Sequence, residues 1–447
     1  MSRLLIYAIV FIEGFCSLGA EVIALRRLLP HVGSSIVVTA PTIGFFLLAL
    51  ALGYAAGGRV AAGYRQIVAR NFLISALLAG IGLAGATVDA LFTHLQPALF
   101  AYLIFISGVL CPLAWLLGQT VPILTNLMQA ERTGEASGQA LYWSTLGSFL
   151  GSLSLSLLVM QWFGVAAAVL ACTLGLLAGA LLLSGCQPKM LILLASTAAV
   201  SLLVNLQHAI TADTAYADYA VTAVELPGQV EPRAFMVNQS LASLIDAAEP
   251  PHTTRYIEHL RHILLDELAF QDREILVLGA GGFMLSQGEP RNHYTYVDID
   301  PQIRDIAEQH FLRQTANGEF VADDARRFVA TTPRRFAAVV VDVFSSHTSI
   351  PSHLVTREFW ASLRRVIEPD GVLLANLILD GKLATPYAQK LLASIESVYG
   401  RCAVEVLHKG KPISNVEVTC YASGQATRAT PYRDELNRAD LDRALAR

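Results

Sequence analysis

The chain has 447 residues, of which 54% are hydrophobic and only 15% are charged, whereas ordinary soluble domains carry about 25% charged residues. The mean hydropathy is +0.49. These values exclude a disordered chain, a fibrous repeat and an ordinary cytosolic enzyme. The length is sufficient for two or three domains, each with its own core.

Charge is distributed unevenly along the chain. Residues 1–210 hold 8 of the 32 basic residues and 5 of the 36 acidic residues. The formal charge is therefore +3 in residues 1–210 and −7 in residues 211–447. The acidic second half argues against nucleic acid as a partner and is compatible with a cationic substrate.

The first half contains runs long enough to cross a bilayer. A spanning helix needs about 20 apolar residues, because the hydrocarbon is about 30 Å thick and each residue rises about 1.5 Å. We therefore expect residues 1–210 to form a transmembrane helical bundle of a multi-pass inner-membrane protein, in contact with the lipid bilayer. Seven runs meet the requirement: Leu4–Ala24, Ile36–Gly57, Asn71–Phe92, Ala98–Leu117, Leu141–Met160, Phe163–Leu183 and Met190–Gln207.

The orientation of this bundle has two conflicting indications. A cytoplasmic N-terminus places six basic loop residues inside the cell, and the opposite orientation places two inside. With seven spans, that rule puts residues 211–447 outside the cytoplasm. The chemistry expected for this half requires a cytosolic cofactor, and on that ground we expect a cytoplasmic C-terminal domain.

The second half has the pattern of an α/β protein. Residues 211–270 read as a lead-in, with a β-hairpin of Tyr219–Leu226 and Arg233–Val237 followed by a helix at His252–Leu268. Apolar strands and helices then alternate through residues 271–447, which predicts a mainly parallel, Rossmann-like sheet covered on both faces. The expected strands are Ile275–Leu278, Tyr294–Val297, Glu319–Ala322, Ala337–Val341 and Val372–Leu377.

Glycine or acidic residues follow the first four of these strands, where ligands of such sheets bind. Gly279-Ala280-Gly281-Gly282 follows the first, and Asp298, 19 residues after Gly279, follows the second. An acid at that distance commonly accepts hydrogen bonds from ribose hydroxyls. Asp323-Asp324 and Asp342 follow the third and fourth strands. Together they predict a nucleoside site.

The phosphate-binding signatures of common nucleotides are absent from the sequence. The glycine turn departs from GxGxxG because Met284 occupies the sixth position, and there is no GxxxxGK[ST] element. NAD and nucleoside triphosphates therefore fit less well than an adenosine that carries a sulfonium group.

Four segments taken together resemble the spermidine synthase (polyamine aminopropyltransferase) family: Ile275–Gly282, Tyr296–Asp300, Asp323–Arg326 and Ala338–Ser345. The preceding apolar half is similar to the bacterial branch with a fused multi-span domain. The resemblance implies a methyltransferase-type fold and a homodimer. It also implies transfer of an aminopropyl group from decarboxylated S-adenosylmethionine to an amine such as putrescine, with release of methylthioadenosine. We expect no metal, because no metal-ligand spacing occurs in the sequence.

The resemblance also implies roles for particular residues. Asp342 corresponds to the catalytic proton acceptor. The residues expected to hold the sulfonium donor and its adenine are Gly279, Gly281, Asp298, Asp324 and Ala325. The residues expected near the amine are Tyr216, Gln239, Tyr256 and Ser345.

The chain departs from the family on the amine side. Gly282 and Ser345 stand where members usually carry Asp, and Ala217 and Ile257 replace a Gln and a His. Two other functions therefore stay open. One is methyl transfer from intact S-adenosylmethionine. The other is a non-catalytic transporter or sensor that binds a polyamine or a nucleoside, for which Glu13 within the first span is the main support.

The six cysteines show neither a CxxC pair nor a metal-ligand spacing. Four of them lie in or beside apolar runs, and Cys402 and Cys420 lie in the second half. We expect free thiols, mostly buried, at all six positions.

Overall fold

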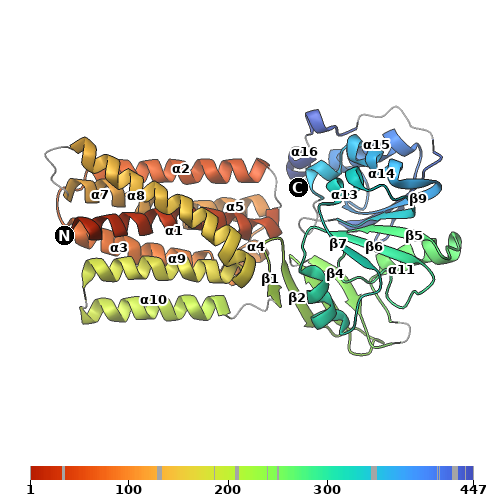
Figure 1. Cartoon of the computed structure of the whole chain (residues 1–447), viewed down its shortest axis with the longest axis horizontal. Helices are drawn as coiled ribbons and strands as arrows, with labels where there is room; N and C mark the ends of the chain where they lie inside the picture. Colours follow the sequence, from red (N-terminus) through yellow and green to blue (C-terminus); the bar gives the residue numbers. More distant parts are fainter. Residues whose placement is uncertain are drawn as a thin grey trace. The chain divides into compact units, whose positions relative to one another are not determined.

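The structure is a computed structural model of the whole chain, and Figure 1 shows its elements. It divides into two compact units, one formed mainly by residues 1–209 and the other mainly by residues 216–447. The residues described are 2–32, 36–127, 133–185, 187–206, 211–238, 240–248, 251–343, 350–409, 411, 413–424, 431–437 and 439–445.

The first unit is a bundle of helices (Figure 1). Short π-helical stretches interrupt three of them, at Leu78–Gly82, Ile106–Leu110 and Leu155–Val159. The α-helices are α1 (Arg3–Val32), α2 (Ile36–Gly58), α3 (Tyr64–Leu77), α4 (Gly85–His94), α5 (Ala98–Phe105), α6 (Cys111–Gly118), α7 (Thr120–Leu127), α8 (Thr133–Ser154), α9 (Met160–Ser184) and α10 (Pro188–Leu206).

Five helical segments in the described residues are long and apolar enough to cross a membrane, and a sixth is obtained if α3 and α4, bent by 64°, count as one span. Seven runs were expected from the sequence. Two of them fall within one continuous segment, Gly134–Ser184. Gly164 (φ 81°, ψ 172°) breaks the helical conformation inside that segment and separates the two runs.

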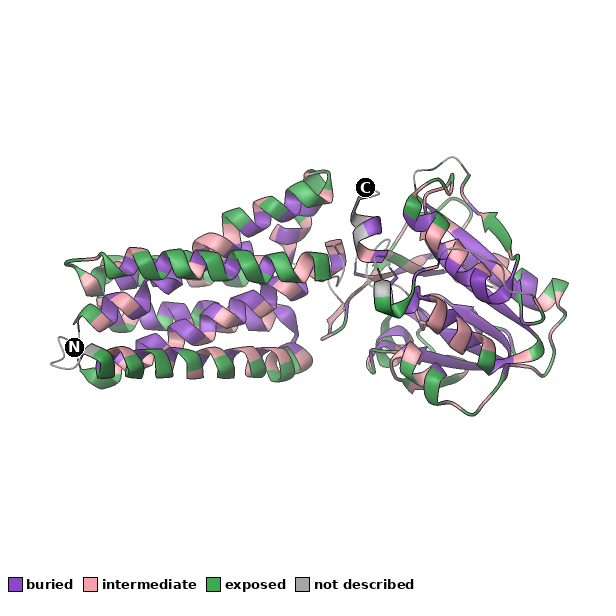
Figure 2. Ribbon diagram, turned by 90° about the horizontal axis from the view of Figure 1, so that it is seen from above, coloured by how far each residue is buried: buried purple, intermediate pink, exposed green. Residues whose placement is uncertain are grey.

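The surface of the bundle is unusually apolar. Large hydrophobic side chains on α2 and α10 are exposed, including Leu48 at 56% and Ile192 at 66%. In Figure 2 the outer faces of several bundle helices are coloured as exposed and the inner faces as buried. Soluble monomers rarely expose such continuous apolar faces.

The second unit begins with a small antiparallel sheet. Strands β2 (Asp218–Ala223), β3 (Arg233–Val237) and β4 (Ser240–Ile245) pair in sequence order, after the short β1 (Ala212–Asp213). The first two match the predicted hairpin, and β4 was not predicted. Helix α11 (Arg255–His262) follows and continues as a π-helical stretch to Glu267.

The main sheet has seven strands in the order β10-β11-β9-β8-β5-β6-β7. Strands β5 to β9 are mutually parallel, and β11 runs antiparallel between β9 and β10. This confirms the predicted Rossmann-like, methyltransferase-type sheet. The strands are β5 (Glu274–Leu278), β6 (His293–Asp298), β7 (Glu319–Ala322), β8 (Phe336–Val341), β9 (Ile367–Leu379), β10 (Ala403–Val406) and β11 (Ser414–Tyr421).

Alternation of side chains along the strands creates two cores, one on each face of this sheet. On β5, Leu276 and Leu278 join one core, and Ile275 and Val277 join the other. The first core is covered by α13 (Ala325–Thr331), α14 (Arg357–Val366), α15 (Pro386–Tyr399) and α16 (Ala439–Leu445). The second is covered by the small sheet, α11 and α12 (Ile303–Ile306) with its π-helical continuation to Leu312.

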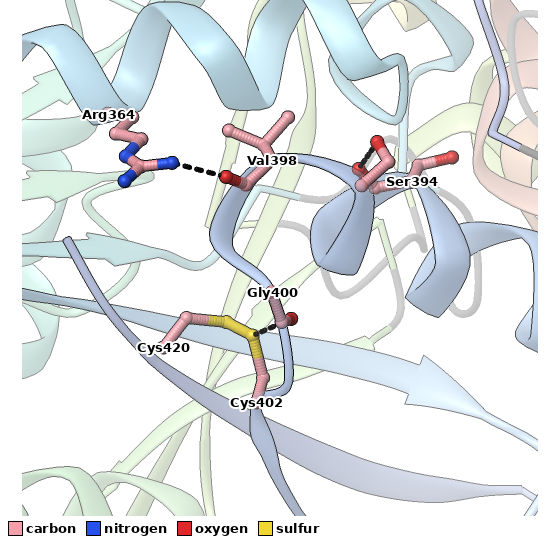
Figure 3. The surroundings of a disulfide bond; sticks show 7 residues. Arg364, Ser394, Val398, Gly400, Cys402 and Cys420 are labelled. Carbon is pink, nitrogen blue, oxygen red and sulfur yellow. Dashed lines mark hydrogen bonds between the residues drawn. A yellow bond between two sulfur atoms is a disulfide. The ribbon is translucent and has the colours of Figure 1, made fainter. Parts of the chain in front are cut away.

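A disulfide joins Cys402 and Cys420, with their Cα atoms 4.7 Å apart. Figure 3 shows this bond, with the Sγ of Cys402 3.6 Å from the carbonyl oxygen of Gly400. The prediction of free thiols is therefore wrong for these two residues. The reason is the pairing of β10 with β11, two strands that the sequence did not predict. Ala403 pairs with Thr419, so Cys402, just before Ala403, lies opposite Cys420, just after Thr419.

Candidate active site

The glycine turn after β5 is shaped by its contact with the end of β8. Gly279 has φ +91°, and a Cβ at this position would lie 2.1 Å from the carbonyl oxygen of Asp342. Only glycine fits both the backbone conformation and the contact. The turn and the carboxylate predicted to act with it therefore lie side by side.

Asp298, the last residue of β6, holds the glycine turn from the other side. Its Oδ2 accepts a hydrogen bond of 2.9 Å from the backbone N–H of Ala280, and its Oδ1 accepts one of 3.0 Å from the N–H of Asp300. Burial raises the pKa of Asp298 to about 6, against the effect of these hydrogen bonds. The carboxylate predicted to bind ribose is thus an anchor of the turn itself.

Asp342 follows β8 directly, and two side chains contact its carboxylate. Asn376 on β9 donates from Nδ2 to its Oδ1 at 2.8 Å, and the hydroxyl of Tyr256 lies 3.1 Å from its Oδ2. Burial raises the pKa of Asp342 to about 6, and the two hydrogen bonds oppose that rise. The group is therefore a carboxylate at neutral pH and is close enough to neutrality to take up a proton.

Tyr256 connects α11 to the strand end. Its hydroxyl also lies 2.6 Å from the carbonyl oxygen of Ala242, just inside β4. Burial and the nearby Asp342 raise the pKa of Tyr256 well above its usual range, so it stays protonated. A hydroxyl has one proton, so Asp342 and Ala242 compete for it, and one lone pair of the carboxylate can serve another donor.

A cavity lies beside these groups. It reaches from the glycine turn and Asp342 to the face of α11 and brings together parts of β4, β5, β6 and β8. Its polar lining comes from Ser243, Tyr256, Tyr296 and Asp342, and the rest is apolar or glycine. A few polar groups therefore converge on one mostly apolar cavity beside the glycine turn.

The structure explains why Gly282 cannot carry the acid that the family resemblance leads one to expect. A Cβ there would lie 2.5 Å from the ring of Phe311 and 2.8 Å from the Cβ of Ser243. The N–H of Gly282 instead donates to the Ser243 hydroxyl at 3.0 Å. The space for an acidic side chain is filled, so position 282 contributes no carboxylate.

Asp324 and Ala325 begin α13 after β7. Asp324 is the N-cap of this helix, and its Oδ1 accepts a 2.9 Å hydrogen bond from the N–H of Arg327. Asp323 is tied to β6 because its N–H donates to the carbonyl of Asp298 at 2.9 Å. The pair thus lies at the strand end next to Asp298, where the sheet order places it.

The described structure does not bring together the four residues predicted to lie near the amine. Tyr256 lines the cavity, whereas Tyr216 is 40% exposed and is not among the described residues that line it. Gln239 and Ser345 lie outside the described residues. Of the four, the described structure brings only Tyr256 to Asp342.

Asn376 and Ser243 are site residues that the sequence did not reveal. Asn376 stands inside an apolar strand, and an amide in the run Leu373–Leu379 was the available signal. Ser243 lies on β4, which carries no strong strand pattern. Both reach the site through strand pairing between distant segments, which local patterns do not encode.

Part of the second unit is similar in sequence to known proteins. Residues 253–407 match the family description "Spermine/spermidine synthase domain". The chain is 30% identical over 145 residues to a polyamine aminopropyltransferase of Vibrio vulnificus, covering 30% of this chain and 48% of that protein. It is 25% identical over 418 residues to polyamine aminopropyltransferase 1 of Streptomyces coelicolor, covering 84% of this chain and 76% of that protein.

Among solved structures, a probable spermidine synthase from Corynebacterium glutamicum is 22% identical, with a TM-score of 0.39, and covers 46% of this chain and 77% of that chain. The chain thus spans about half the length of the Vibrio relative, and most of the Streptomyces relative. The match over residues 253–407 takes in the glycine turn, Asp298 and Asp342. Part of the second unit, residues 253–407, is therefore similar to the spermine/spermidine synthase family.

Proposed function

We propose that the chain is a membrane-integrated polyamine aminopropyltransferase. It transfers an aminopropyl group from decarboxylated S-adenosylmethionine to an amine such as putrescine and releases methylthioadenosine. The observation that carries the proposal is the position of Asp342, which lies against the glycine turn and is oriented by Asn376 and Tyr256.

The proposed aminopropyl transfer requires one proton acceptor. The nitrogen lone pair of a neutral amine attacks the carbon bonded to the sulfonium sulfur. A C–N bond forms, the C–S bond breaks and its electron pair goes to sulfur. The Oδ2 of Asp342 accepts the proton that the nitrogen loses, while Asn376 holds Oδ1 in place. Since a sulfonium is already a good leaving group, positioning can supply much of the remaining acceleration.

The nucleoside side of the site suits an adenosyl donor. Gly279 and Gly281 have positive φ values and leave the backbone of the turn open to close approach. Asp298 and Asp324 stand at the next two strand ends, where such sheets bind nucleosides. These residues are the ones expected to hold the ribose and the adenine.

The direct test is to incubate the purified full chain with decarboxylated S-adenosylmethionine, or with intact S-adenosylmethionine, and a panel of amines. Mass spectrometry of the products then identifies the group transferred. An aminopropylated amine together with methylthioadenosine supports the proposal. Only methylated products, or no product with either donor, contradict it.

One observation favours methyl transfer as the second candidate. Because Phe311 and Ser243 fill the space beside Gly282, this position presents no carboxylate to the primary amine of a decarboxylated donor. A methyl donor has no such amine on its reacting group. Methylated amines and S-adenosylhomocysteine in the same assay would identify this activity.

We also propose that the bundle crosses the membrane seven times. Its apolar outer faces support embedding in lipid, and the break at Gly164 supports two crossings within Gly134–Ser184. Counting α3 with α4 as one crossing, and α5 to α7 as another, gives seven. Retention of the full chain in the membrane pellet after alkaline carbonate extraction is the expected result, and release into the supernatant would contradict it.

A further inference from the structure

Four polar side chains form one row across four adjacent strands of the main sheet. Strand pairing places Glu405 on β10 opposite Glu417 on β11, and Glu417 opposite Asn376 on β9. On the other side, Asn376 is hydrogen-bonded to Asp342 at the end of β8. Residues directly opposite each other carry their side chains on the same face of a sheet. The row therefore runs from the proposed catalytic carboxylate to the outer edge.

Helix α11 covers this row. The hydroxyl of Tyr256 lies 3.1 Å from Asp342, and one turn further along, the Nε2 of His259 lies 3.3 Å from a carboxylate oxygen of Glu417 and 3.3 Å from one of Glu405. The same helix face thus contacts both ends of the row, and the cavity at Tyr256 and Asp342 borders its inner end.

Glu417 differs from its neighbours in having few partners. Only 2% of the residue is exposed, whereas the side chain of Glu405 is 57% exposed. Among the described residues, neither carboxylate oxygen of Glu417 accepts a hydrogen bond. Burial, with the charges of Glu405 and Asp342, raises the pKa of Glu417 to about 8. Apart from the His259 imidazole at 3.3 Å, this buried carboxylate has no polar partner among the described residues, and such a group is costly unless a cation joins it.

We propose that Glu417 binds the second ammonium group of a diamine whose first nitrogen is held at Asp342, so that it selects diamines over monoamines. This inference rests on the proposed aminopropyl transfer and names the residue that recognises the acceptor. Asn376, between the two carboxylates, is neutral and does not compete for the cation.

The spacing suits an amine of this class. Adjacent strands are about 4.8 Å apart, so Asp342 and Glu417 are about 10 Å apart at the backbone. An extended chain of four or five methylenes places its nitrogens about 6–8 Å apart, given bonds of about 1.5 Å. Hydrogen bonds of about 2.8 Å at both ends let such a chain bridge the two carboxylates.

The test compares Glu417→Gln with Glu405→Gln, which removes an exposed carboxylate from the same histidine. Putrescine and n-butylamine are the two acceptors, and kcat and KM are measured for each. We expect Glu417→Gln to raise KM for putrescine at least tenfold, with kcat within threefold and KM for n-butylamine unchanged. Glu405→Gln should leave all four values within twofold. An equal effect on both amines, or none, would overturn the inference.

Two further measurements keep the result decisive. Calorimetric titration of putrescine into the wild type and Glu417→Gln, with methylthioadenosine present, makes the same comparison without turnover. The wild type could transfer no group and still bind putrescine. If Glu417→Gln then loses that binding, the proposed function is refuted and the proposed amine site at Glu417 is retained. Should the Gln variant not fold, Glu417→Asp, which withdraws the carboxylate by one methylene, is expected to shift the preference to a longer diamine. An unchanged preference would count against the site.

A different set of observations concerns the side of the membrane on which the second unit lies. Disulfides persist in oxidising compartments and are rare in the cytosol. The Cys402–Cys420 bond joins two positions that the pairing of β10 with β11 sets opposite each other, at a Cα separation of 4.7 Å within the usual range.

The bundle indicates the same side. Tyr7 near the start of α1 contacts Gln139 on α8, and Arg65 on α3 contacts Leu183 near the end of α9. Both contacts lie at one end of the bundle, because Gly179 on α9 lies against Ile12 of α1 and Phe72 of α3. At the other end, Asp213, which follows α10, lies 3.5 Å from Arg26 near the end of α1. The chain therefore enters the bundle at one end and leaves at the other.

Basic residues are concentrated at the end where the chain enters. Five of those in the described part of the chain lie at or next to that end: Arg3, Arg59, Arg65, Arg70 and Lys189. Arg26 and Arg27 lie toward the other end, and Arg26 is paired with Asp213 there. Cytoplasmic loops carry the excess of Lys and Arg.

We infer that the second unit lies on the non-cytoplasmic side, opposite to the placement expected from the need for a cytosolic cofactor. The inference rests on the proposed membrane integration, and it requires the sulfonium donor to be available on that side.

Reporter fusions after Arg447 in a bacterial host test this placement. An active alkaline phosphatase fusion and a dark green fluorescent protein fusion are expected, and the reverse pattern would overturn the inference. Independently, acid quenching and alkylation of whole cells should find Cys402 and Cys420 protected until reduction. Labelling of both cysteines without reduction would also contradict it. Release of the chain by carbonate would refute membrane integration itself.

Discussion

Asn376 donates a 2.8 Å hydrogen bond to Asp342 and thereby joins the interior of β9 to the end of β8. The bond leaves the other carboxylate oxygen facing the hydroxyl of Tyr256. Asn376 is held in turn by Asn415 on β11, whose Nδ2 donates to its Oδ1 at 2.9 Å. The orientation of the proposed proton acceptor therefore depends on three neighbouring strands.

Replacing Asn376 by Ala should weaken catalysis through Asp342. The hydrogen bond favours the charged carboxylate, so its loss raises the pKa of Asp342 further above about 6. We expect kcat to fall about tenfold, and the acidic limb of the kcat/KM profile to move to higher pH. Profiles of wild type and Asn376→Ala between pH 5 and 9 check this, and a limb that stays in place would refute the coupling.

The buried negative charge of Asp342 should lower the free energy of unfolding of the second unit at alkaline pH. Its pKa in the folded chain, about 6, lies above the ordinary value of 3.8. The folded state therefore gains protons before the unfolded state as the pH falls, and stability rises between about pH 7 and pH 4. At pH 8 we expect Asp342→Asn to stabilise the second unit by about 1–3 kcal/mol.

The same difference should shrink toward pH 4, where the wild-type carboxyl is neutral. Thermal unfolding of both proteins in detergent at several pH values measures it. A pH-independent difference would show that charge burial at Asp342 is not the cause.

Gly282→Ala should destabilise the glycine turn. The new Cβ would meet the Phe311 ring at 2.5 Å and Ser243 at 2.8 Å, and overpacking of this kind costs about 1–3 kcal/mol. Phe311→Leu removes part of the obstacle. In a double-mutant cycle, Phe311→Leu should therefore lower the free energy of unfolding less in the Gly282→Ala variant than in the wild type. Additive costs would mean that the turn moves aside instead.

Reduction of Cys402–Cys420 should lower the stability of the second unit. The bond closes a loop across a sequence separation of 18 residues, for which loss of the cross-link typically costs about 3 kcal/mol. Melting curves with and without reductant, with Cys402→Ser/Cys420→Ser as the control, should show a fall in the wild type and none in the variant. A wild type insensitive to reductant would contradict the prediction.

Much of the second unit could be predicted from the sequence, because the strands β5 to β9 are short, apolar and separated by helical segments. Their polar ends, including Gly279, Asp298 and Asp342, meet at one edge as parallel pairing requires. These features are encoded locally, by residue type and by position relative to a strand end.

The rest depends on contacts between distant segments. Asn376 lies at Asp342 because β9 pairs with β8. Glu417 joins the row because β11 pairs between β9 and β10, and the pairing of β10 with β11 also aligns the two cysteines of the disulfide. The sequence shows that Gly282 departs from the family pattern. The reason for this departure is the ring of Phe311, about 30 residues later in the chain, and only the folded structure shows that contact. Tyr216 was placed by analogy and is not among the residues that line the described cavity.

The central claim is that Asp342 accepts the proton of the attacking amine. Single-turnover rates of wild type, Asp342→Asn and Asp342→Ala, with the donor and putrescine both saturating, test it most directly. We expect both variants to form methylthioadenosine at least about 100-fold more slowly while binding the donor with unchanged affinity. Rates within about threefold of the wild type would contradict the claim.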